Sequence, residues 1–134
     1  MFNIEARGLI LDAAQQPPQG RISFFTSLCV LRSGTILCGC QNGPGKHAPT
    51  CTARISRSTD GGRTWELLPT RFETQIGGQP GSLSGGEMVE VAPGRLLLFT
   101  TWFDRSDPAR PLFDPVTEGI LDRKSTRLNS SHSS

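Results

Sequence analysis

Short apolar runs separated by turn residues make up most of this chain. The densest run covers residues 23–31 and a second covers residues 35–40, with Arg32-Ser33-Gly34 between them. Apolar runs of this length, bounded by Gly, Ser or Asn, are typical of β-strands. The first two runs therefore predict a β-hairpin with its turn at Gly34.

The same pattern continues on either side of this hairpin. After a loop over residues 42–49, residues 52–57 alternate between apolar and polar positions, and residues 65–68 form a further short run. Together with the hairpin, these segments predict one four-stranded antiparallel sheet. Before the hairpin, residues 3–11 predict a strand and residues 13–20 predict a loop or linker.

A second unit repeats the first at an offset of 60 residues, which aligns Gly34 with Gly94. Residues 87–91 and 95–104 are predicted strands, and residues 74–86 are a glycine-rich loop before them. The flanking apolar positions then coincide: Leu31 with Val91, Ile36 with Leu96 and Leu37 with Leu97. An internal repeat of this kind indicates a repeating β architecture.

The most specific motif is the turn between the third and fourth predicted strands, Ser58-Thr59-Asp60-Gly61-Gly62-Arg63-Thr64-Trp65. An aspartate in such a turn can accept hydrogen bonds from nearby backbone N–H groups, and the glycines tolerate positive φ. The spacing Ser-x-Asp-x-Gly-x-Thr-Trp resembles the Asp box, or BNR repeat, of the sialidase-like β-propellers. The resemblance implies a structural turn, and a Ca²⁺ or ligand site at Asp60 is the alternative. The residues of the structural turn are Ser58, Asp60, Gly62, Thr64 and Trp65.

The resemblance also implies an all-β fold, an incomplete sialidase-like β-propeller from a full-length protein of about six blades. Residues 1–22 would form an N-terminal strand and linker, residues 23–72 the first blade, and residues 73–121 an incomplete second blade with its own Asp box near residue 118. Each blade buries its faces against its neighbours, so the remaining blades of the full-length chain are the expected partners. The isolated chain is expected to be poorly soluble or partly unfolded.

Residues 122–134 differ from the rest of the chain. They show no apolar period, and the segment from Asp122 to His132 resembles the conceptual translation of a common sequencing adapter. We interpret residues 122–134 as a non-native tail, and an ordinary disordered polar tail is the alternative. Without its three basic residues and one acidic residue, the 14 Lys and Arg and the 12 Asp and Glu of the chain become 11 of each. The net charge of +2 then falls to zero and gives no support to nucleic-acid binding.

Several other classes of function also lack support in the sequence. No apolar run approaches the roughly 20 residues that span a bilayer, and no secretion signal is visible, so we expect no membrane partner and a cytoplasmic location by default. The glycine-rich segment lacks the phosphate-loop pattern, and we expect no cofactor. The cysteines form no C-x-x-C pair, so we expect no metal site and favour reduced thiols over a disulfide. These cysteines are Cys29, Cys38, Cys40 and Cys51.

The resemblance implies specific catalytic positions. In hydrolytic sialidases an Arg-Ile-Pro motif opens the first strand of a blade, and its arginine binds the substrate carboxylate. Alignment with that strand places Phe24 at the arginine position, and a phenylalanine cannot clamp a carboxylate. The Arg21-Ile22 pair lies nearby but three residues out of register. The family's acidic proton donor follows the second strand, where this chain offers only Lys46 and His47 as ionisable residues.

The loop over residues 104–118 is richer in acidic residues, with Trp102 and Phe103 immediately before it. Carboxylates beside aromatic side chains suit glycan binding and glycosidic acid–base catalysis. Asp104 is our candidate catalytic residue because it ends a predicted strand; a solvated loop with internal ion pairs is the alternative. The candidate ligand-binding residues are Arg21, Lys46, His47, Trp102 and Arg105.

The resemblance implies a sialidase-like glycoside hydrolase, of the exo-α-sialidase type, that acts on a glycan. The other catalytic residues of the family would lie in further blades, so we expect the chain alone to be inactive. The alternative is a non-catalytic β-propeller that binds carbohydrate or protein.

Overall fold

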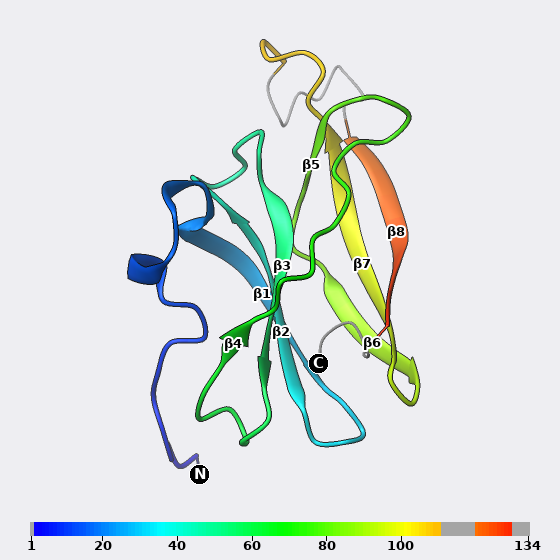
Figure 1. Ribbon diagram of the computed structural model, residues 1–134. Helices are drawn as coiled ribbons and strands as arrows, with labels where there is room; N and C mark the ends of the chain where they lie inside the picture. Colours follow the sequence, from blue (N-terminus) through cyan, green and yellow to red (C-terminus); the bar gives the residue numbers. More distant parts are fainter. Residues whose placement is uncertain (1, 111–119, 130–134) are drawn as a thin grey trace.

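The computed structural model describes the backbone of residues 2–110 and 120–129, with side chains for residues 2–110. The described chain is all-β, and its two antiparallel sheets do not close on themselves (Figure 1). The first sheet has the order β1-β2-β3-β4, and in the second β7 lies between β8 on one edge and β5 and β6 on the other. The strands are β1 (Ile22–Val30), β2 (Ile36–Gly43), β3 (Thr52–Ser58), β4 (Glu66–Leu67), β5 (Gly81–Leu83), β6 (Glu87–Ala92), β7 (Arg95–Asp104) and β8 (Ile120–Asn129).

The first sheet confirms the predicted four-stranded meander. β2 extends to Gly43, three residues beyond its predicted end, because the start of β1 provides a partner for it: Ile22 pairs with Gly43. β3 and β4 flank the Asp-box turn, and Ser56 pairs with Leu67 across it. The four strands thus form the order that the apolar pattern indicated.

The strand predicted over residues 3–11 is absent, and this prediction was wrong. The segment runs along the outer side of the first sheet without pairing to a strand (Figure 1). Two single turns of 3-10 helix, η1 (Ala13–Gln15) and η2 (Pro18–Gly20), connect it to β1. Ile4 and Leu9 are 69% and 70% exposed. These apolar side chains are therefore not buried against a sheet, as the predicted strand would require.

β5 lies within the segment predicted as a glycine-rich loop. Its three residues pair with the end of β7, from Gly81 opposite Asp104 to Leu83 opposite Trp102, and all three are buried. A Cβ atom at Gly81 would collide with the indole of Trp102. Glycine is therefore required here by close packing, and the composition that indicated a loop instead marks a tight strand contact.

The register of the two sheets confirms the predicted repeat of 60 residues. Ile22 pairs with Gly43 in the first sheet, and Ser82 pairs with Phe103 in the second. β1 has a bulge between Phe24 and Ser27, where Phe25 adopts a φ of 51°. In the second sheet Gly85 and Gly86 lie at the corresponding positions and divide β5 from β6. After this irregularity the repeat resumes, with Ser27 opposite Gly39 and Glu87 opposite Phe99.

A continuous hydrophobic core joins the two sheets. Leu37 and Leu96 are fully buried, and Ile55 and Trp102 are each only 1% exposed. The core side chains alternate along their strands, as expected for sheets with one face packed against a neighbour. The core consists of Cys29, Leu31, Leu37, Ala53, Ile55, Leu68, Leu83, Met88, Leu96, Leu98 and Trp102.

Residues 120–129 form β8, which pairs antiparallel with β7 along its free edge. Residues 122–134 were expected to lie outside the fold, because they show no apolar period and resemble a translated sequencing adapter. Backbone hydrogen bonding along a sheet edge depends little on side chains, so a polar segment without proline can occupy this position. The expected second Asp box near residue 118 lies outside the described residues.

All four cysteines are buried and free. In the described part of the chain, no helix has the length and apolar character needed to cross a membrane.

Candidate functional site

Asp60 organises the Asp-box turn through its carboxylate. Its Oδ1 accepts hydrogen bonds from Ser58 Oγ at 2.8 Å, Arg63 N at 3.0 Å and Thr64 N at 2.9 Å. Its Oδ2 accepts a further hydrogen bond from Thr64 Oγ1. These bonds, with those from Thr64 strongest, hold the pKa of Asp60 well below its usual range. Both carboxylate oxygens are engaged by the turn itself, which favours a structural role over a cation site.

Trp65 and the glycines complete this turn. The indole Nε1 of Trp65 donates to Gly62 O at 3.0 Å, and Gly62 N donates to Ser58 Oγ at 2.9 Å. Gly61 and Gly62 have φ values of 76° and 89°, which a side chain would strain. The backbone hydrogen bonds to Asp60 and the positive φ of the glycines, both expected from the sequence, are therefore present, and the hydroxyl and indole contacts add to them.

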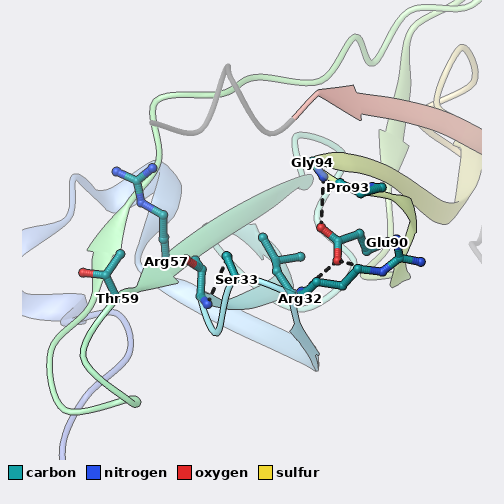
Figure 2. Close-up of a pocket in the computed structure, with 9 residues that line it drawn as sticks. Arg32, Ser33, Arg57, Thr59, Glu90, Pro93 and Gly94 are labelled. Atoms are coloured by element: carbon teal, nitrogen blue, oxygen red, sulfur yellow. Dashed lines mark hydrogen bonds and ion pairs between the residues drawn. The ribbon is translucent and has the colours of Figure 1, made fainter.

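A cavity of about 290 Å³ lies beside this turn, between the hairpin turns of the two sheets (Figure 2). Glu90 reaches across it and accepts hydrogen bonds from Arg32 N at 2.8 Å and Gly94 N at 3.1 Å. Arg57 lines the opposite side and bonds to Glu66. Because Glu90 and Arg57 are engaged within the protein, we assign this cavity a structural role.

The opposite ends of the strands carry a different group of side chains. Arg105, just after β7, donates from Nε to Ser82 Oγ and from Nη2 to His47 O, both at 2.8 Å. This links the loop after β2 to the second sheet. Lys46 Nζ lies 5.4 Å from the ring centroid of Phe25 and 5.7 Å from that of Phe24. We call these residues the loop cluster: Phe24, Phe25, Lys46, His47 and Arg105.

The loop cluster is cationic. His47 packs against Phe25 with their ring centroids 5.6 Å apart, and it has a φ of 56°. Burial, followed by the charges of Lys46 and Arg105, lowers the pKa of His47. His47 is therefore mainly neutral at pH 7, and the positive charge of the cluster comes from Lys46 and Arg105.

Asp104 lies at the end of β7 next to this cluster. Its Oδ1 accepts a hydrogen bond from Ser106 N at 2.8 Å, and its Oδ2 lies 3.9 Å from Arg110 Nη1. Hydrogen bonding by Ser106, with a smaller contribution from the charge of Arg110, lowers the pKa of Asp104. An ionised carboxylate of this kind can accept a proton or a hydrogen bond, but it is poorly suited to donate a proton at neutral pH.

The structure brings together three of the five candidate ligand-binding residues: Lys46, His47 and Arg105. Trp102 lies elsewhere, because its side chain shares the buried face of β7 with Leu98 and donates to Thr74 O at 2.8 Å. Arg21 precedes β1 and donates to Gln16 O at 3.0 Å.

Sequence reasoning missed the role of two aromatic residues in the cluster. Phe24 and Phe25 were assigned to an apolar strand, yet Phe25 is 51% exposed and both rings lie close to Lys46. Two adjacent aromatic residues cannot both face the core in a regular strand. That adjacency was the available signal for a bulge and for an exposed ring.

Within residues 2–110, no group of three or more His, Cys, Asp or Glu side chains could hold a metal ion. A scan against models of protein families gave no match, and searches of curated proteins and of solved structures gave no significant similarity.

Proposed function

We propose that this protein belongs to a sialidase-like β-propeller and that its loop cluster binds an acidic glycan. The supporting observation is the position of Lys46, whose ammonium group lies over Phe24 and Phe25. Phe24 occupies the position at which the resemblance implies a carboxylate-binding arginine. Lys46, from the loop after β2, therefore supplies a positive charge close to Phe24, the position at which the family has its arginine.

The chemistry of the cluster suits a charged sugar. The exposed face of Phe25 offers a surface for the C–H groups of a sugar ring. Lys46 is exposed and can form a charge-assisted hydrogen bond to a carboxylate. Arg105 is held by Ser82 and the His47 carbonyl, so it contributes fixed positive charge beside the site. In this proposal the other blades of the full-length chain complete the binding surface.

Binding is favoured over hydrolysis by the acid–base groups of the described residues. Glycoside hydrolysis requires a proton donor and a second carboxylate about 5–10 Å apart. Asp104 is ionised, and Lys46 and His47 are unusual donors to a glycosidic oxygen. A sialidase-like hydrolase is the second candidate function, favoured by the position of Asp104 at the strand end beside the cluster, where its carboxylate could act as a base or nucleophile.

The proposal is tested by titrating the 134-residue protein with 3′-sialyllactose and with lactose, followed by NMR or calorimetry. We expect binding of the acidic sugar and about tenfold weaker binding of it by Lys46→Ala, equivalent to about 1.4 kcal/mol. Arg63→Ala, an exposed cation on the Asp-box turn, is the matched control and should bind normally. Equal affinity for both sugars, or unchanged binding by Lys46→Ala, would refute the proposed site.

The hydrolase candidate has a separate readout. Release of sialic acid by the full-length protein should be lost in Asp104→Asn if Asp104 is catalytic, with binding retained. Unchanged turnover in this variant would remove Asp104 from the reaction.

A further inference from the structure

The outer face of the second sheet is apolar and exposed. On β6, Val89 and Val91 are 44% and 46% exposed, and on β7 Phe99 is 39% exposed. These side chains alternate with Met88, Leu96 and Leu98, which point into the core. We call Val89, Val91, Leu97 and Phe99 the outer face of the second sheet.

The internal repeat relates this outer face to a buried one. Shifted back by 60 residues, Val89, Val91 and Leu97 become Cys29, Leu31 and Leu37, which are buried core residues of the first sheet. The register of strand pairing is preserved by the same shift. In the first sheet, the equivalent face packs against the second sheet. The outer face of the second sheet has the same strand geometry and is therefore suited to pack against a further sheet. Phe99 stands where the first sheet has Gly39, the point at which Met88 packs closely within the molecule. Leu28 of a docking copy would therefore meet the Phe99 ring, and the contact would differ in detail at this position.

The first sheet carries the complementary outer face. Met88 and Leu96, which cover the core from the second sheet, correspond to Leu28 and Ile36. Leu28 is 64% exposed and its neighbour Val30 is 68% exposed. The N-terminal segment covers a different part of the same side of the first sheet, where residues 9–11 line a cavity with Cys38 and Cys40. It leaves Leu28 and Val30 exposed. Leu28 and Val30 form what we call the outer face of the first sheet.

We propose that, where no further blade of a longer chain covers these faces, a second copy of this protein docks head to tail, with the outer face of its first sheet on the outer face of the second sheet. The contact would continue the packing between the two sheets within one molecule. Such an interface is heterologous, since each copy uses a different surface and keeps one face free for a further copy. Burial of exposed Val, Leu and Phe side chains would supply the driving force.

The test is the mass of the 134-residue protein in solution, measured by sedimentation velocity from on the order of 1 µM to on the order of 100 µM. We expect the wild-type protein to associate as its concentration rises. Val89→Lys and Val30→Lys each place a charge on one face, and each variant alone should remain monomeric. An equimolar mixture should form dimers, because each variant keeps the face that the other has lost.

Ile4→Lys is the matched control, since Ile4 is 69% exposed and lies in the N-terminal segment next to the Asp-box turn. It should associate like the wild type, and far-UV circular dichroism should show that all variants are folded. A wild-type protein that stays monomeric would overturn the proposal and leave the faces to other partners, such as further blades. Symmetric association would also overturn it: one lysine variant would then still dimerise alone, and mixing would restore nothing.

Discussion

The carboxylate of Glu90 in the second sheet accepts a 2.8 Å hydrogen bond from the backbone N–H of Arg32 in the first. Its other oxygen accepts from Gly94 N at 3.1 Å, within its own hairpin turn (Figure 2). One side chain thus ties together the turns of the two sheets through a bond between residues 58 positions apart in sequence. This contact fixes the relative position of the sheets at the end opposite the loop cluster.

Glu90→Ala should lower the melting temperature, because it leaves two backbone N–H groups to water and removes the link between the turns. Thermal unfolding followed by circular dichroism at pH 7 measures the effect. Glu87→Ala, on the exposed side of the same strand, is the control and should melt close to the wild type. Equal melting temperatures for the two variants would show that the link contributes nothing to stability.

The pH dependence of stability should reflect Asp60. Its pKa is lower in the folded protein than in the unfolded chain, so its contribution to stability is present above about pH 4 and is lost as the pH falls through the folded-state value. Asp60→Asn should therefore be less stable than the wild type at pH 7, and the difference should narrow toward pH 2. Urea unfolding at several pH values measures this. A difference that stays constant with pH would contradict the role of the ionised carboxylate.

Gly81→Ala should be strongly destabilising, because the new Cβ would meet the Trp102 ring in the core. We expect a loss of about 1–3 kcal/mol in the free energy of unfolding, typical of overpacking. Gly45→Ala introduces a Cβ with no heavy atom within 4 Å and should change stability little. Chemical denaturation of both variants provides the comparison, and similar losses would argue against the close packing at Gly81.

Trp102→Phe separates a core role from a ligand-binding role. The variant loses the hydrogen bond from Nε1 to Thr74 O and part of a buried ring, so we expect a loss of about 1–3 kcal/mol in the free energy of unfolding. Binding of 3′-sialyllactose should be unchanged once the protein is folded. Weaker binding with unaltered stability would instead place Trp102 on the ligand face.

The sequence by itself determined the features that depend on neighbouring residues. The Asp-box turn is encoded within residues 58–65, because Asp60 bonds to groups two to four positions away. The four strands of the first sheet and the repeat of 60 residues also follow from local apolar patterns, confirmed by strand register.

Only the tertiary structure decided the features that depend on distant partners. β5 is a strand because β7 pairs with it, and residues 3–11 are not a strand because none of the strands described in the structure pairs with them. Arg105 meets the carbonyl of His47 across 58 residues of sequence, and Trp102 is buried because its face of β7 packs against the first sheet. The physical reason is that a residue type sets what a side chain can bond, whereas the folding of the two sheets against each other sets which partners come within reach.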